Sequence, residues 1–188
     1  MPSIFSKKNF KTQPWKNGGG TTLELYRIPN DSDGFHFRLS IATVNDDGPF
    51  SNFPGINRTI MLLEGRGMSL KFPHQEIKID QELCPLNFDG GEKIDCRLLA
   101  GPLCDFNVMV ERNWGKTEVK ILKDLSSLDK TFEESTFVFV YKGGLTFEGQ
   151  YLGEETLLHF GQKESIKAVV DQLSILIVIQ LTILNSDI

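Results

Sequence analysis

The sequence predicts an all-β protein built from two similar halves, and three observations on the 188-residue chain support this prediction. The chain contains 14 Phe and 17 Gly; aromatic residues favour half-buried, pleated strands, and glycine permits tight turns. Short apolar runs are separated by turn residues at about every eight to twelve positions, which is typical of a sandwich or a barrel. Ile60–Phe72 and Phe137–Gly149 each hold an apolar run, a glycine turn and an alternating run, which indicates an internal duplication.

The first half is organised around the stretch Phe35–Leu70. Within it, Phe37–Val44 alternates, and the side chains of a strand change faces at every residue. The two predicted faces carry Phe37, Leu39 and Ile41 on one side and Arg38, Ser40 and Ala42 on the other. Either face could turn towards the inside of a barrel. The segment Asp46–Gly55 then holds two Pro and two Gly among aromatic residues, which predicts a sharp bend before Arg58.

Three consecutive glycines, Gly18–Gly20, precede another alternating stretch, and they predict a turn or a close approach of the backbone. Two interpretations are open. The glycines form a plain hairpin loop, or their amides cradle an anion beside Lys16 and Asn17. Because the spacing is not that of a P-loop or a dinucleotide-binding turn, a nucleotide is not the expected ligand.

A second polar pair lies in the run Asp105–Val110. Asp105, Asn107 and Met109 share one predicted face, and the residues between them share the other. A polar pair beside apolar residues can line a pocket, and a solvated strand face is the alternative.

The polar stretch 113–134 is the predicted connector between the halves, which places one barrel-like half at 1–112 and another at 135–188. In the second segment, Ser165–Gln172 has weak helical character. Leu173–Leu184 is strongly apolar but too short for a membrane helix, so it is interpreted as a buried strand.

Composition and charge exclude several classes of protein. The net charge of −5 argues against nucleic-acid binding, which needs a basic surface to replace phosphate counterions. The three cysteines, an odd number without Cys-x-x-Cys spacing, fit reduced thiols. The N-terminus lacks the apolar core of a signal peptide. We therefore expect a cytoplasmic protein without a membrane or nucleic-acid partner.

Several sequence blocks together resemble the HutD/Ves family of bicupins. The matching blocks are Trp15–Thr22, Phe37–Val44, Asp47–Arg58, Leu62–Gly67 and Asp105–Met109. The resemblance implies an all-β, cupin-like (RmlC-like jelly roll) fold with two β-barrel halves packed into one compact unit. It also implies an association with histidine utilisation or stress response, without an established reaction. After the glycines the family usually has Thr-Arg-Glu, whereas this chain has Leu23 at the middle position; we expect weaker or different anion binding if that arginine contacts the anion.

With this fold, we expect a regulatory binding protein whose pocket holds a small carboxylate, because a guanidinium group matches a carboxylate with two parallel hydrogen bonds. The alternative for each arginine is a structural ion pair with Asp46, Asp47 or Glu64. The expected ligand-binding residues are Lys16, Asn17, Arg38, Ser40, Arg58, Asp105 and Asn107.

The predicted site contains no metal and no cofactor. The positions of the usual cupin ligands, counted back from the strand-closing glycines, hold no histidine, and none of the three His forms a His-x-His pair. The alternative function is a metal-independent isomerase or lyase acting on a small acid, with His36 or Asp105 as general base beside Arg38. A homodimer is also compatible with the apolar second half.

Overall fold

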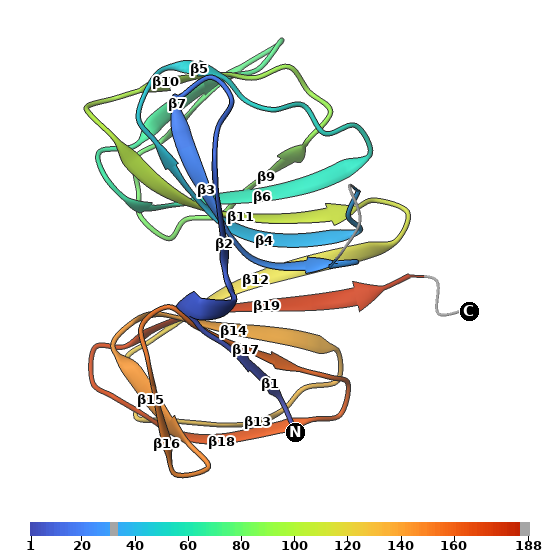
Figure 1. Ribbon diagram of the computed structural model, residues 1–188, viewed down its shortest axis with the longest axis vertical. Coiled ribbons are helices and arrows are strands. Elements are labelled where there is room, and N and C mark those ends of the chain that lie inside the picture. The colour runs from blue at the N-terminus through green and yellow to red at the C-terminus, as the bar shows by residue number, and fades with distance from the viewer. Residues whose placement is uncertain (31–33, 185–188) are drawn as a thin grey trace. The chain divides into compact units, whose positions relative to one another are not determined.

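The computed structural model describes residues 1–30 and 34–184, and it confirms the all-β fold class. The described residues form nineteen strands and one short 3-10 helix, η1 (Lys7–Asn9). The chain folds as two compact units (Figure 1). We call Lys11–Gly115, together with Leu184, the N-terminal unit, and Met1–Phe10 with Lys116–Ile183 the C-terminal unit.

The N-terminal unit consists of two antiparallel sheets. The six-stranded sheet has the order β2 (Lys11–Pro14), β3 (Gly20–Ile28), β4 (Phe37–Val44), β11 (Leu103–Glu111), β6 (Ile56–Glu64), β9 (Leu86–Asp89). The four-stranded sheet has the order β5 (Gly48–Pro49), β10 (Asp95–Leu98), β7 (Met68–Lys71), β8 (Glu76–Ile79). The alternation predicted for residues 37–44 is that of β4, a central strand of the larger sheet.

The C-terminal unit also has two antiparallel sheets. The five-stranded sheet has the order β1 (Ser3–Phe5), β17 (Thr156–Phe160), β14 (Ser135–Lys142), β19 (Ile175–Ile183), β12 (Gly115–Lys123). The four-stranded sheet has the order β13 (Ser127–Thr131), β18 (Ser165–Val170), β15 (Gly144–Phe147), β16 (Gln150–Gly153). Because β1 pairs with β17, the first ten residues belong to this unit.

The two units repeat one strand order, as the duplication in the sequence predicts. The order β4-β11-β6-β9 in the first corresponds to β12-β19-β14-β17 in the second, and β5-β10-β7-β8 corresponds to β13-β18-β15-β16. The turns between β6 and β7 and between β14 and β15 contain Gly67 (φ +96°) and Gly143 (φ +74°), where a side chain would collide with Ile79 and Ser174. Each unit is a jelly-roll sandwich of two separate sheets rather than a closed barrel.

Three segments test the expectations for the second half. The apolar run 173–184 forms β19, as predicted, whereas the weakly helical prediction for Ser165–Gln172 is wrong. That stretch forms β18, whose residues alternate between exposed and buried. The stretch 113–134, interpreted as a connector, holds β12 and β13. The end of the predicted second segment, 185–188, lies outside the described residues.

A hydrophobic core joins the two sheets of the N-terminal unit. Ile60 from β6 and Met68 and Leu70 from β7 are completely buried in it, and each such side chain contributes about 1.5–3 kcal/mol relative to exposure. Ala42 of β4 belongs to this core and also lines the cavity described below. The polar side chains of the cavity therefore project from a wall that is packed against this core.

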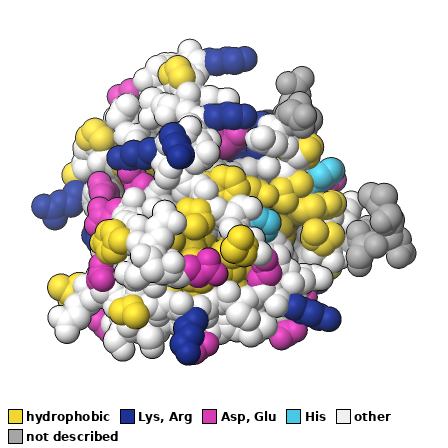
Figure 2. All heavy atoms as spheres, turned by 60° about the horizontal axis from the view of Figure 1, so that its bottom comes forward, with side chains coloured by type: hydrophobic (Ala, Val, Ile, Leu, Met, Phe, Trp, Pro, Cys, Tyr) yellow, Lys and Arg dark blue, Asp and Glu magenta, His cyan; other side chains and the backbone are white. Residues whose placement is uncertain are grey.

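The charged side chains are mixed on the surface. On the face seen in Figure 2, Lys and Arg side chains are scattered among Asp and Glu side chains. This face therefore offers no concentrated basic surface. Within residues 1–30 and 34–184, no helix has the length and apolar character needed to cross a membrane.

Candidate functional site

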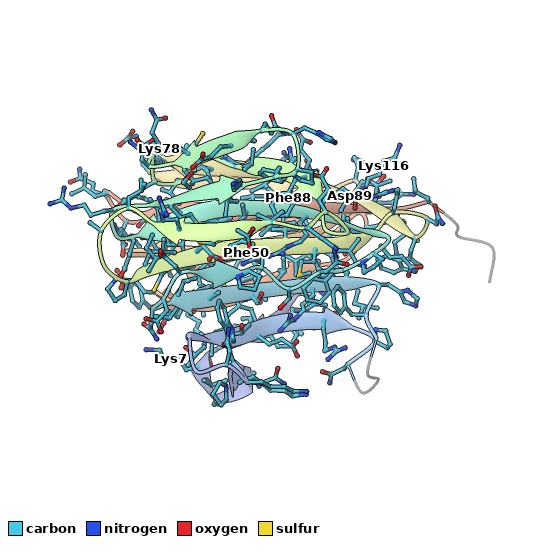
Figure 3. All side chains as sticks on the ribbon, turned by 90° about the horizontal axis from the view of Figure 1, so that it is seen from above. Lys7, Phe50, Lys78, Phe88, Asp89 and Lys116 are labelled. Atoms are coloured by element: carbon cyan, nitrogen blue, oxygen red, sulfur yellow. The ribbon has the colours of Figure 1, made fainter. Side chains whose placement is uncertain are left out.

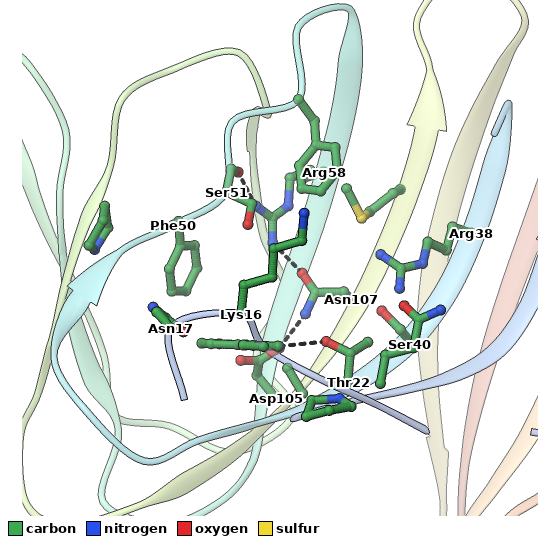
Figure 4. A pocket seen from close by; sticks show the side chains of 17 residues that line it. Lys16, Asn17, Thr22, Arg38, Ser40, Phe50, Ser51, Arg58, Asp105 and Asn107 are labelled. Atoms are coloured by element: carbon green, nitrogen blue, oxygen red, sulfur yellow. Dashed lines mark hydrogen bonds between the residues drawn. The ribbon is translucent and has the colours of Figure 1, made fainter. Parts of the chain in front are cut away.

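A cavity of about 480 Å³ opens in the N-terminal unit (Figure 4). Its walls come from the β2–β3 hairpin, from β4, β6 and β11, and from the segment around β5. All seven residues expected from the sequence to bind a ligand line it: Lys16, Asn17, Arg38, Ser40, Arg58, Asp105 and Asn107. The fold therefore brings together the seven side chains that the sequence singles out.

The pairing of β4 with β11 explains how two distant segments supply one wall. Directly opposed residues of antiparallel strands project to the same face of the sheet, and Ser40 lies opposite Asn107. Residues two positions away on each strand share that face. The side chains that these two strands send into the cavity are Arg38, Ser40, Ala42, Asp105, Asn107 and Met109. The face that carries Arg38 is therefore the inner one.

Arg58 of β6 is the most deeply placed cation of the cavity, with only 7% of its surface exposed. Its Nη2 donates a hydrogen bond to Asn107 Oδ1 at 2.6 Å, and its Nη1 lies 3.5 Å from the Ser51 carbonyl. Its Nε is buried and has no hydrogen-bond partner. An unsatisfied buried donor on a cation costs about 1–3 kcal/mol or more, so an acceptor supplied by a ligand would stabilise this group.

Three aromatic rings surround the Arg58 guanidinium. Its central carbon lies 5.4 Å from the ring centroid of Phe50, 5.6 Å from that of Phe53 and 5.1 Å from that of Phe88. Phe50 and Phe88 are labelled in Figure 3. Such contacts attract the cation electrostatically but offer it no hydrogen bonds. Burial among them lowers the pKa of Arg58 to about 10, so the guanidinium remains charged at neutral pH.

Asp105 of β11 is a buried acid in the same wall, with 1% of its surface exposed. Desolvation raises its pKa to about 7, although the nearby Arg58 charge and the hydrogen bond from Asn107 act in the opposite direction. Asn107 Nδ2 donates that hydrogen bond to Asp105 Oδ1. The amide of Asn107 therefore bridges the cation and the acid.

Arg38 of β4 has an ion-pair partner that the sequence did not indicate. Its Nε lies 2.7 Å from Oε2 of the buried Glu24 of β3, and Arg27 approaches the same oxygen at 3.9 Å. Within the described part of the chain, Arg38 and Arg58 form no ion pair with the expected partners Asp46, Asp47 or Glu64. Glu24 orients Arg38 through a single nitrogen, which leaves the two terminal nitrogens of the guanidinium facing the cavity.

The three glycines serve the turn rather than an anion cradle. Gly18 N donates to the Trp15 carbonyl and Gly19 N donates to Asn17 Oδ1 at 3.1 Å. A side chain at Gly20 would meet the Trp15 ring at 3.0 Å, so glycine permits the close approach. Because the amides of Gly18 and Gly19 already have acceptors, these observations favour the hairpin interpretation. The polar side chains that this loop contributes to the cavity are Lys16 and Asn17.

Other expected residues lie away from the cavity. His36 pairs with Glu111 and stacks on Trp114 at a centroid distance of 5.3 Å, so of the two suggested bases only Asp105 lines the cavity. Leu23 lies opposite Ile41, on the face of β3 and β4 that points away from the cavity. The departure from the family's arginine at this position therefore leaves the cavity lining unchanged.

Sequence reasoning missed the aromatic wall and the role of Glu24. The rings of Trp15, Phe50 and Phe53 line the cavity, and Trp15 is held by a hydrogen bond from Nε1 to Thr22 Oγ1 at 2.8 Å. The aromatic residues in the bend 46–55 were the available signal for Phe50 and Phe53. The described residues contain no group of three or more His, Cys, Asp or Glu that could hold a metal ion.

The family model for HutD matches residues 7–177 of the chain. The chain belongs to the HutD family. It is 39% identical over 107 residues to an uncharacterised 21.2 kDa protein from the hutC 3′ region of Pseudomonas putida. The aligned region covers 56% of this chain and 56% of that protein, so the match spans just over half of that relative. It is 32% identical over 144 residues to Protein Ves of Escherichia fergusonii, covering 76% of this chain and 70% of that one.

A solved structure of the same family agrees with this fold. HutD from Pseudomonas fluorescens SBW25 superimposes with a TM-score of 0.82 at 28% identity, covering 98% of this chain and 100% of that chain. The chain therefore shares its all-β architecture with a solved HutD over almost its whole length.

Proposed function

We propose that this HutD-family chain is a small-molecule binding protein whose cavity takes a small carboxylate. The observation that carries the proposal is the guanidinium of Arg58, which is buried at the cavity with an unpartnered Nε. A planar, permanently charged fork is suited to a carboxylate, because it can offer two parallel N–H donors at once. A ligand carboxylate would give this buried donor an acceptor.

The rest of the lining supports an anion of modest size. Lys16, Arg38 and Arg58 contribute three cationic side chains, against the single carboxylate of Asp105 among the lining residues. The volume of about 480 Å³ falls within the range of small-molecule sites, which is roughly 300–1,000 Å³. Aromatic rings complete the wall, so the ligand would have an apolar body as well as its charged group.

A regulatory role in histidine utilisation or in stress response is part of the proposal. The names of the relatives support it: one relative comes from the hutC 3′ region, one is HutD and one is Ves. The HutD structure is described for a formate condition, and formate is the simplest carboxylate probe. A cytoplasmic location fits the unpaired Cys84, Cys96 and Cys104. A homodimer is a further expectation, which sedimentation of the purified chain would test.

Proton transfer is the second candidate function, and one observation favours it. Burial raises the pKa of Asp105 to about 7, which is the range in which a carboxylate can act as a general base near neutral pH. This candidate is an isomerase or lyase acting on a small acid without a metal. Exchange of carbon-bound hydrogen in a bound acid in D₂O, followed by NMR and lost in Asp105→Asn, would support it.

A thermal-shift screen against small carboxylates tests the binding proposal. We expect one of formate, urocanate, formylglutamate or histidine to raise the melting temperature saturably, because a ligand that binds only the folded state stabilises it by mass action. At a concentration of about 100 times the dissociation constant, the gain corresponds to a rise of roughly 5–10 °C. Sodium chloride at equal ionic strength is the control. If no carboxylate shifts the melting temperature beyond this control, the proposal is wrong.

A further inference from the structure

A buried carboxylate is an unexpected component of a cavity for anions. Asp105 is 1% exposed and lines the same cavity as three cationic side chains. A carboxylate at this place repels the carboxylate of a ligand, and its burial is costly without donors. Its presence is explained if part of the ligand needs an acceptor.

The orientation of the Asn107 amide defines what Asp105 can do. Arg58 Nη2 donates to Asn107 Oδ1 at 2.6 Å, and this places the amide nitrogen towards Asp105, to which it donates. Because Asn107 already donates to Oδ1, Asp105 acts as a hydrogen-bond acceptor. Among the described residues, no second donor reaches the other oxygen, Oδ2, and no ion pair joins Asp105 directly to Arg58.

The cavity therefore has a basic pole at Arg58 and an acidic pole at Asp105, and the Asn107 side chain separates them. In Figure 4, Arg58 lies on one side of Asn107 and Asp105 on the other, and dashed lines mark the two hydrogen bonds of the bridge. Trp15, whose ring is fixed by Thr22, belongs to the same lining as the acidic pole. A ligand that fills both poles needs an acid group and a hydrogen-bond donor in one small molecule.

We propose that the ligand is a bifunctional acid, whose carboxylate is held by the arginines and whose N–H group donates a hydrogen bond to Asp105. This proposal rests on the carboxylate-binding function proposed above and names the ligand class of that site. Asp105 then acts as the residue that selects acids with a ring or amide N–H over acids without one. A site built to accept a hydrogen bond rejects an analogue that lacks the donor, because the acceptor is left buried and unpaired.

Calorimetric titration with matched pairs of acids tests the selection directly. Pyrrole-2-carboxylate and 2-furoate have rings of the same size, but the pyrrole ring has an N–H donor where the furan ring has an oxygen. A second pair, 3-(pyrrol-2-yl)propanoate and 3-(furan-2-yl)propanoate, repeats the comparison with a longer spacer between ring and carboxylate. The titrations are run at about pH 8, where a carboxyl with a pKa of about 7 is mostly ionised. We expect the pyrrole acid to bind at least about 10-fold more tightly in one of the two pairs.

The variant Asp105→Asn reverses the chemistry at the acidic pole. Its amide oxygen would take the hydrogen bond from Asn107 and leave an NH₂ group facing the ligand, so the preference for the pyrrole acids should disappear. The control is Asp46→Asn, which neutralises an exposed carboxylate of the nearby turn that does not line this cavity.

The outcomes separate the two proposals. Equal affinity of the pyrrole and furan acids in both pairs would overturn the selection by Asp105 and leave carboxylate binding intact. Binding of no acid in either pair, together with a negative thermal screen, would overturn both. A pyrrole preference that survives in Asp105→Asn would assign the donor contact to another residue and would also overturn this inference.

Discussion

Replacing Arg58 with methionine is expected to weaken the binding of pyrrole-2-carboxylate at least about 100-fold, measured by calorimetric titration. Methionine keeps an unbranched apolar stem among the surrounding rings but removes the charge and every N–H donor. The binding energy lost is that of a charge-assisted pair in a buried site, where each hydrogen bond to a charged group contributes about 1.5–3 kcal/mol. Because only 7% of the Arg58 surface is exposed, solvent does not replace these bonds.

Two further variants separate binding from folding. Arg97→Met removes an exposed arginine of β10 and should leave the affinity unchanged. Arg58→Lys keeps the charge but loses the planar fork, so an affinity between those of the unchanged chain and Arg58→Met is expected. Urea unfolding of each variant shows whether the fold survives. A folded Arg58→Met that binds the acid as tightly as the unchanged chain would rule out a role for this guanidinium.

The second large effect is a dependence of stability on pH that comes from Asp105. Burial raises the pKa of this carboxyl from 3.8 in the unfolded chain to about 7 in the folded protein. The folded state therefore holds the proton more tightly, and this contribution to stability is fully present below about pH 4 and is lost as the pH rises through about 7. At about 1.4 kcal/mol per pKa unit, the loss amounts to roughly 4 kcal/mol.

Urea unfolding across this pH range checks the prediction. The difference in unfolding free energy between Asp105→Asn and the unchanged chain should grow in favour of the variant as the pH rises from about 4 to about 8, because asparagine does not ionise. Asp46→Asn is measured beside it as the control, since that carboxyl is exposed and lies outside the cavity lining. A flat difference for Asp105→Asn would mean that Asp105 titrates like an ordinary surface acid.

The cavity-lining strand β11 differs from its counterpart in the other unit, β19. In β11 the inward-facing residues include the polar Asp105 and Asn107, whereas the corresponding β19 sends Leu176 and Val178 into a hydrophobic core. That core also contains Phe160 of β17. Polar side chains at these positions are costly without a role, so the contrast agrees with a binding function for the N-terminal unit.

The sequence predicted the strand-borne part of the site because alternation is a local property. Once β4 and β11 are strands, the face of Arg38 and the face of Asp105 follow from the period of two residues. Their meeting in one wall depends on the pairing of β4 with β11, which no local pattern of the sequence shows.

The parts that were missed depend on tertiary contacts. Nothing in the local pattern of β3 shows that Glu24 lies against Arg38, since the contact arises from the register of two strands and a bulge next to Glu24. The bend 46–55 has no period, so the direction of its rings could not be inferred. In Ser165–Val170 the alternation of β18 outweighs the weak helical propensity, because a strand there buries Ile166 and Val170.

The most direct test of the account is a calorimetric comparison of pyrrole-2-carboxylate with pyrrole-2-carboxamide on the unchanged chain. The two compounds have nearly the same shape and the same ring N–H, and they differ in the charge of the group offered to Arg58 and Arg38. If the cavity is a carboxylate site, the acid binds with saturable heat and the amide binds at least about 10-fold more weakly. Equal affinity for acid and amide, or no heat of binding for the acid or any carboxylate of the screen, would contradict it.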